Sequence, residues 1–254
     1  MKVDPLNDDL RHQLGMTYIA AHEYNKALEV YRLGLTLSPD QIGFRRWMTF
    51  SRIALGYNLE SALKESGLTN DVWTKIVGYD FVDKSVKVLE AKRKEGKILN
   101  ADQHDYRPLT LDYALTYYLQ GNRDLAKRYA DSTASFLLVK QNAMANNYRL
   151  FASLGKAHAI SGNAKAAVQS GEKATELLPI TLDAIDGPYY EQNLAEIYII
   201  MKQYDVALDK IEKLLSIPGY FSVGWMMVNP IYEPLRDLPR FKKLVEKYKY
   251  MAKK

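Results

Sequence analysis

Histidines and carboxylates are the side chains from which this chain could build a catalytic or metal site, and the sequence does not group them. The four histidines are His12, His22, His104 and His158, and none lies at metal-ligand spacing from another. His104 precedes Asp105, but such a pair acts in catalysis only beside a nucleophile, and the neighbouring residues offer none. The sequence also contains no glycine-rich phosphate-binding motif. We therefore expect no enzyme activity, no cofactor and no metal site.

The composition favours a globular chain in a reducing compartment. The sequence contains no cysteine, which excludes disulfides, thiol catalysis and cysteine-based zinc sites. Hydrophobic residues make up 47% of the chain, which is enough for a continuous core. No apolar run approaches the roughly 18 residues of a membrane span, and the N-terminus has no stretch of signal-peptide type. These features predict a soluble protein, and we expect it in the cytoplasm.

The formal net charge of +5 is concentrated at the C-terminal end of the chain. Seven basic residues lie between Arg240 and Lys254, against Glu246 as the one acidic residue. A terminal basic helix is more often a solvated cap than a surface that binds phosphate groups. Nucleic-acid binding through Lys242 to Lys254 and the region from Lys84 to Lys97 is therefore the less favoured alternative.

Four stretches of the chain share one spacing. A small or aliphatic pair is followed three residues later by an aromatic or similar residue, and an alanine follows nine residues after that. This spacing resembles the tetratricopeptide repeat (TPR), a helix-turn-helix unit in which small residues let two antiparallel helices approach closely. The resemblance implies an all-α fold, a right-handed superhelical solenoid of antiparallel helix pairs with a C-terminal capping helix. The stretches are Leu14-Gly15 with Tyr18 and Ala27, Tyr113-Ala114 with Tyr117 and Ala126, Leu154-Gly155 with His158 and Ala167, and Leu194-Ala195 with Tyr198 and Ala207.

The repeat pattern divides the chain into helix pairs around an irregular middle. We expect a single solenoid domain over residues 1–254, in which residues 68–106 form an irregular helical insertion and residues 220–254 form the C-terminal cap. Inside the insertion, a short helix is expected at residues 71–78 and a longer one at residues 81–95. Complete repeats are expected at residues 8–41, 107–140, 142–179 and 188–219, with a degenerate repeat at residues 42–67.

The resemblance to the TPR also implies where a partner would bind. In that family, the first helix of each pair lines a groove that holds a peptide or protein segment. Matching positions one by one predicts a groove in which Tyr118 and Tyr189 anchor the partner, while Arg149 and Lys156 make polar contacts. The insertion or the terminal helix could fill the same groove, and this alternative stays open. The predicted groove residues are His12, Met16, Ile19, Leu115, Tyr118, Arg149, Lys156, Tyr189, Gln192 and Glu196.

The last third of the chain resembles the C-terminal repeat region of bacterial multidomain proteins. In that family, such regions follow serine/threonine kinase, adenylate cyclase or DNA-binding regulatory domains. The resemblance implies a regulatory arm that acts in cis on a domain absent from this chain, as the alternative to a scaffold that binds a separate protein. It rests on Glu176–Pro179, Asp183–Pro188, Asn193–Tyr198, Leu214–Pro218, Asn229–Arg236 and Pro239–Phe241.

The beginning of the chain favours a longer array. Residues 3–7 look like the end of one repeat and the start of the next, because proline commonly follows the second helix of such a unit. We therefore expect this chain to be part of a longer protein. An array cut at this point would leave an apolar face of the first repeat uncovered, which makes a homo-oligomer a further alternative.

Overall fold

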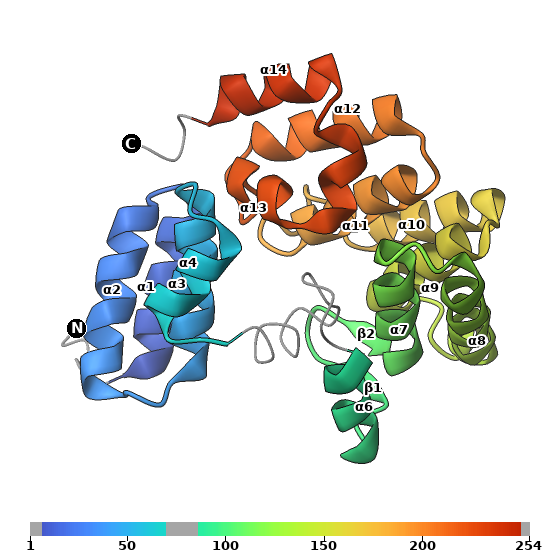
Figure 1. The fold of residues 1–254 in the computed structure, drawn as a ribbon, viewed down its shortest axis with the longest axis horizontal. Helices are drawn as coiled ribbons and strands as arrows, with labels where there is room; N and C mark the ends of the chain where they lie inside the picture. The colour runs from blue at the N-terminus through green and yellow to red at the C-terminus, as the bar shows by residue number, and fades with distance from the viewer. Residues whose placement is uncertain (1–6, 70–85, 250–254) are drawn as a thin grey trace.

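The computed structural model describes residues 7–69 and 86–249, and this part of the chain is almost entirely helical. The first four helices pack as two antiparallel pairs, which we call the N-terminal block (Figure 1). The helices of the block are α1 (Asp8–Ala20), α2 (Tyr24–Leu37), α3 (Ile42–Ala54) and α4 (Leu59–Ser66).

A second stack of helices follows, in which each helix pair packs on the next. The first helices of its three pairs are α7, α9 and α11, and α9 contacts both of the others. A short helix and a two-stranded β-hairpin precede α7, and the hairpin contacts α7 and α9. The elements are α6 (Val86–Lys94), β1 (Leu99–Ala101), β2 (Tyr106–Pro108), α7 (Leu109–Leu119), α8 (Arg123–Gln141), α9 (Tyr148–Ser161), α10 (Ala164–Leu177), α11 (Gly187–Ile200) and α12 (Tyr204–Leu215).

The chain then turns back across both stacks before its last described helix. We call residues 217–235 the C-terminal segment, which contains α13 (Val223–Val228) and the 3₁₀-helix η1 (Pro230–Leu235). Helix α13 contacts α3 of the N-terminal block, and η1 contacts α11 of the second stack. Helix α14 (Pro239–Tyr248) packs on α12 (Figure 1). The C-terminal segment therefore connects the two stacks.

Close helix crossings explain the residue spacing of the first repeat. A Cβ atom at Gly15 would lie 2.2 Å from Cζ of Tyr31, so the contact between α1 and α2 requires a residue without a side chain. Ala27 is fully buried. The N-terminus of α1 is capped by Asn7, whose side-chain oxygen accepts a hydrogen bond from the backbone N–H of Leu10 at 3.1 Å. The spacing that predicts the repeat is therefore a packing requirement of the helix pair.

The two stacks have separate hydrophobic cores that meet on α3. Phe44 and Met48 belong to the core of the N-terminal block, together with residues of α1 and α2. Ile53, on the same helix, is fully buried in the larger core, which also contains Trp225 and Met226 of α13. Ile53 therefore packs in the larger core, as do Ala62 and Leu63 of α4, whereas Ala54 at the end of α3 belongs to the smaller one.

The junction between the N-terminal block and the C-terminal segment depends on close backbone contact. The N–H of Gly219 donates a hydrogen bond to the carbonyl of Ala20 at 2.9 Å. A Cβ atom at Gly224 would lie 1.8 Å from the carbonyl oxygen of Ile53. The ring of Phe50 lies 5.2 Å from that of Trp225, centroid to centroid. Only glycine at residue 224 allows α13 to pack this closely on α3.

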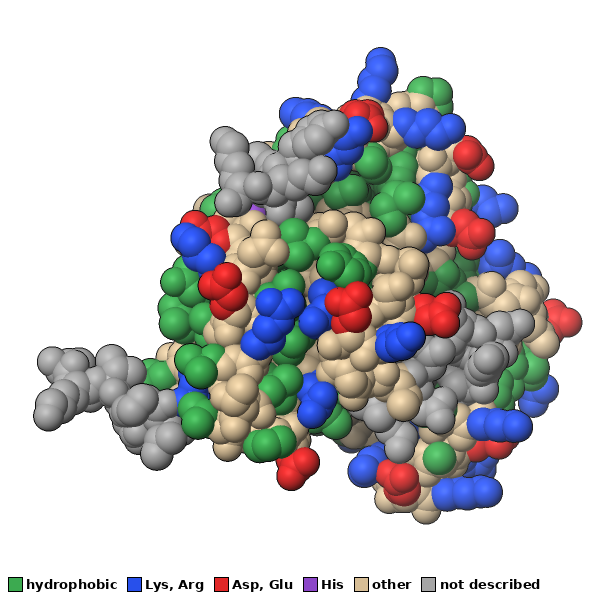
Figure 2. Space-filling model, turned by 60° about the vertical axis from the view of Figure 1, so that its left-hand side comes forward, with side chains coloured by type: hydrophobic (Ala, Val, Ile, Leu, Met, Phe, Trp, Pro, Cys, Tyr) green, Lys and Arg blue, Asp and Glu red, His purple; other side chains and the backbone are tan. Residues whose placement is uncertain are grey.

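The outer face of the first helix pair remains partly uncovered by the described residues. Leu10 and Leu14 on α1 keep 42% and 46% of their surface exposed. The matching residues of the later repeat, Leu150 and Leu154, are 0% and 1% exposed, and α9, on which they lie, contacts α7 and α8. Figure 2, in which this side of the molecule comes forward, shows hydrophobic side chains at the surface among charged ones.

The middle of the chain differs from the sequence-based expectation. Residues 99–108 form an antiparallel hairpin in which Asn100 pairs with Arg107, whereas the sequence predicted an irregular helical insertion without strands. The expected helix at residues 71–78, and the first part of the helix expected at residues 81–95, lie outside the described residues. None of the helices within the described ranges is long and apolar enough to cross a membrane.

We predict that Gly224→Ala lowers the free energy of unfolding by about 2 kcal/mol, because the new methyl group must displace the backbone of α3. Gly219→Ala is the matched control, since a Cβ atom there meets nothing within 4 Å, and its change stays within about 0.5 kcal/mol. Urea unfolding of both variants measures the difference. Equal stability of the two variants would contradict the close contact.

A second prediction concerns two turns with left-handed backbone conformation. His22 and Lys202 both have φ of 61°, at turns where other helix pairs have Gly121 or Gly162. We expect Lys202→Gly to stabilise the protein by about 1 kcal/mol, because glycine adopts this conformation without steric cost. His22→Gly should gain nothing, because it removes a ring that stacks on Tyr24. Denaturant titration measures the free energy of unfolding of both variants. An equal gain in stability for the two would contradict this account.

Candidate functional site

Six predicted groove residues, Gln192 on α11 among them, lie on one face of the second stack. Arg149 and Lys156 stand two turns apart on α9, Tyr189 and Glu196 stand two turns apart on α11, and Tyr118 lies near the end of α7. We call this surface, formed by the first helices of the three pairs, the inner face. The hairpin and the C-terminal segment both pack against it. The predicted groove residues on this face therefore contact other parts of the same chain.

The tip of the hairpin is held at one end of the inner face. Tyr190 donates a hydrogen bond from its hydroxyl to the carbonyl of His104 at 2.9 Å. Tyr189 donates to Oδ1 of Asp105 at 3.0 Å, and burial raises the pKa of Tyr189 well above its usual value, so the hydroxyl keeps its proton. Arg149 donates to the carbonyl of Asp102. Three side chains of α9 and α11 thus donate to two backbone carbonyls and one carboxylate of a single loop.

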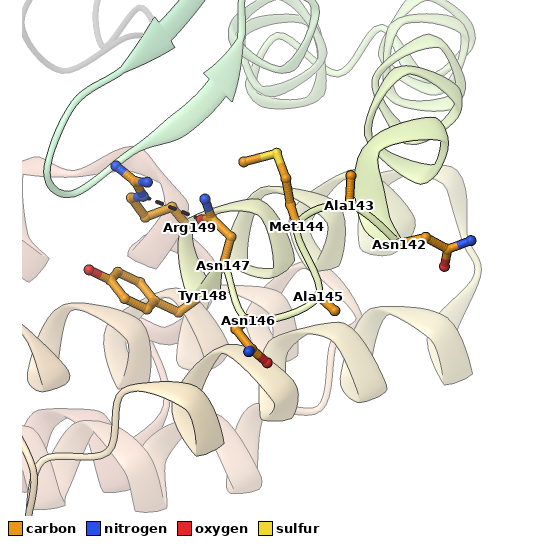
Figure 3. A pocket seen from close by; sticks show the side chains of 8 residues that line it. All are labelled: Asn142, Ala143, Met144, Ala145, Asn146, Asn147, Tyr148 and Arg149. Atoms are coloured by element: carbon orange, nitrogen blue, oxygen red, sulfur yellow. Dashed lines mark hydrogen bonds between the residues drawn. The ribbon is translucent and has the colours of Figure 1, made fainter.

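Arg149 lies in the first turn of α9, next to the loop that joins α8 to α9. Residues 142–149 line an open hollow of about 530 Å³, and Figure 3 shows Arg149 on the side of the hairpin strands, with Asn142 turned away from them. Nε of Arg149 also donates to Oδ1 of Asn147 at 3.3 Å, which orients the guanidinium group. The hollow is lined mainly by alanine and asparagine side chains, which carry no charge. Arg149 is the charged residue of this lining.

The base of the hairpin is fixed by buried charges. The carboxylate of Asp112 on α7 is 3% exposed and lies 2.9 Å from Nε of Arg107 and 3.7 Å from Nζ of Lys92. Arg107 also pairs with Asp105 at 3.2 Å. Burial raises the pKa of Asp112 to about 6, although both cations act in the opposite direction. These pairs connect the hairpin to α6 and α7.

A second polar cluster occupies the other end of the inner face. Nζ of Lys156 lies 2.6 Å from Oε2 of Glu196, and these residues are 9% and 2% exposed. Oε1 of Glu196 accepts hydrogen bonds from Gln192 at 2.9 Å and from the hydroxyl of Tyr232 at 3.1 Å. Tyr232 lies in η1, so the C-terminal segment covers the Lys156–Glu196 pair. Lys156 and Glu196 therefore interact with residues of the same chain.

The α7 residues of the predicted groove differ in exposure. Tyr118 is partly buried, its hydroxyl lies 3.4 Å from the carbonyl of Ile200, and Arg123 lies 4.2 Å above its ring. Leu115 is 1% exposed and belongs to the core. Leu115 therefore has no surface available to a partner.

The three remaining predicted residues lie in the N-terminal block. Ile19 is 2% exposed and is part of the smaller core, where it also offers no surface. His12 and Met16 are partly buried, and the His12 ring lies 6.3 Å from that of Trp47. Burial lowers the pKa of His12 below its usual value. Ile19 therefore belongs to a different core from the residues of α9 and α11.

Sequence reasoning did not identify Arg46, which faces the hairpin from the N-terminal block. The charge of Asp102 acts on the pKa of Arg46, although burial lowers that pKa overall. The guanidinium carbon lies 4.8 Å from the centre of the Trp47 ring. Arg46 follows His12 by 34 residues, which is the length of one repeat. The position that corresponds to His12 in the next repeat would therefore have identified Arg46.

We predict that Lys156→Met lowers the free energy of unfolding by about 3 kcal/mol, because the carboxylate of Glu196 is left buried without a cation. Adding Glu196→Gln should restore at least half of the loss, since no buried charge then remains. Lys165→Met, at an exposed position of α10, serves as the control and should change stability by less than about 0.5 kcal/mol. A small effect of Lys156→Met in thermal or urea unfolding would argue against the buried pair.

Comparison with known proteins identifies the repeat. Within the described residues, no group of three or more histidine and acidic side chains is placed to hold a metal ion. No curated protein matches the chain. Residues 8–41 match the family model of the tetratricopeptide repeat, and they coincide with the α1–α2 pair whose close crossing is described above. With this match and its consecutively packed helix pairs, the chain is a TPR-like protein with the fold of an all-α helical solenoid.

Proposed function

We propose that this protein binds a peptide segment of a partner protein on its inner face, at the position where the hairpin tip lies. A tetratricopeptide repeat supports a role as a scaffold for protein–protein interaction. The proposed site is the end of α9 and α11 that carries Arg149, Tyr189 and Tyr190. The observation that carries it is the convergence of these three donors on one loop.

The chemistry of these donors suits an extended or turned peptide. Arg149 and Tyr190 donate to backbone carbonyls, which every peptide offers, whereas Tyr189 donates to a carboxylate. The rings of Tyr148 and Tyr190 meet edge to face, with centroids 4.8 Å apart, so the surface is rigid before a partner arrives. Rigid aromatic side chains lose little conformational entropy on binding.

The hairpin is a replaceable occupant of this site. Its strands are three residues long, and residues 100–103 at its tip are exposed. A two-stranded hairpin is marginally stable by itself, so its position depends on the contacts with α7, α9 and α11. A partner segment that supplies the same acceptors could therefore take the place of the tip.

The proposal predicts that a peptide with the sequence of residues 98–109, labelled with fluorescein, binds more tightly when the chain's own tip is removed. Replacing residues 101–106 by glycine and serine of equal length should raise its affinity at least about tenfold over the unmodified protein, because competition is lost. Fluorescence anisotropy measures the affinity.

Two further variants locate the bound peptide. In the tip-replaced protein, Tyr189→Phe should weaken binding about tenfold, because a hydrogen bond to a carboxylate is lost. Tyr57→Phe, at an exposed tyrosine outside the inner face, should leave the affinity unchanged. Equal affinity for the unmodified and tip-replaced proteins, or equal effects of the two tyrosine variants, would contradict the proposed site.

A further inference from the structure

A crevice of about 570 Å³ lies at the junction of the N-terminal block and the C-terminal segment, away from the inner-face contacts described above. We propose that it binds a small, flat aromatic compound that carries one hydrogen-bond donor. The size falls within the range of about 300–1,000 Å³ that is usual for ligand sites, and such sites often lie between two packed units. The lining includes Ile53, Leu215, Phe221, Val223, Met227 and His22.

The lining explains the apolar and aromatic part of the ligand. Besides the aliphatic residues, the crevice is bordered by the rings of Tyr24, Tyr57 and Tyr248. Its described lining includes the charged residue Lys249, which pairs with Glu246, but no aspartate or glutamate, so a cation would find no counter-charge there. Tyr57 and Met227 remain 41% and 47% exposed, so these side chains are free to move at the solvent side. A neutral ring compound therefore fits these surroundings better than a cation does.

His22 supplies the hydrogen-bonding part. Nε2 of its ring is buried and has no partner among the described residues, and the backbone of Gly219 lies near enough to the ring to act on its pKa. In the tautomer that carries the proton on Nδ1, Nε2 offers a lone pair to a donor. Burial lowers the pKa of His22, which keeps the ring neutral at pH 7. An unsatisfied acceptor of this kind requires a donor.

The backbone of His22 adds an independent observation. Its φ of 61° is costly for a residue other than glycine, and the corresponding turns after α7 and α9 contain Gly121 and Gly162. The cost is offset in part by the stacking of His22 on Tyr24, with ring planes 11° apart. The ring is thus fixed at the border of the crevice by contacts on two sides.

The test compares two bicyclic probes of similar shape. Indole has an N–H donor, whereas 1-benzothiophene has none. Titration of the full chain, followed by the methyl resonance of Met227 in NMR spectra, should show saturable binding of indole about tenfold tighter than that of benzothiophene. This ratio corresponds to one net hydrogen bond.

Two variants separate the site from its hydrogen bond. His22→Asn tolerates the left-handed backbone but is too short to replace the ring nitrogen, so indole and benzothiophene should then bind equally. Met227→Trp fills the crevice from a half-exposed position and should abolish binding of both probes while the protein stays folded. The proposal is overturned if indole leaves the Met227 resonance unchanged, if Met227→Trp binds it normally, or if the tenfold ratio survives in His22→Asn.

Discussion

The contact between Gly224 and the carbonyl of Ile53 is the constraint on which the rest of the structure depends. A side chain at residue 224 would begin 1.8 Å from that oxygen, so the backbone of α13 reaches α3 only through glycine. The hydrogen bond between Gly219 and Ala20, at the end of α1, is a second backbone contact between the C-terminal segment and the N-terminal block. Together they hold the N-terminal block, which has its own core, against the end of the array.

The packing of the C-terminal segment and the hairpin determines which residues of the inner face a partner can reach. The C-terminal segment that meets α3 also places Tyr232 over the Lys156–Glu196 pair, and the hairpin tip occupies the other end at Arg149 and Tyr189. Buried polar groups at both ends are satisfied within the chain, so a partner must offer equivalent acceptors before it can replace them. The competition between the hairpin and a partner therefore depends more on hydrogen bonds than on the apolar surface that each buries.

The sequence predicted the helix pairs because their requirements are local. Gly15 and Ala27 lie within one repeat, and their spacing directly reflects the crossing of α1 and α2. The hairpin was missed because its strands have three residues each, too short for an alternating pattern, and its tip is held by distant residues such as Tyr189 and Tyr190. The junction was missed because Gly224 and Ile53 are far apart in the chain, and no periodicity connects them. Ile19 and Leu115 were assigned to a groove although they are core residues, since position in a repeat does not reveal burial.

The most direct measurement is the distance between spin labels on the two units that the junction connects. The chain contains no cysteine, so single cysteines at the exposed positions Glu29 on α2 and Lys243 on α14 can be labelled selectively. Double electron–electron resonance should give one narrow distance distribution that broadens in Gly224→Ala. A broad distribution in the unmodified background would show that the N-terminal block is not docked, and would contradict the closed arrangement on which the account of the inner face rests.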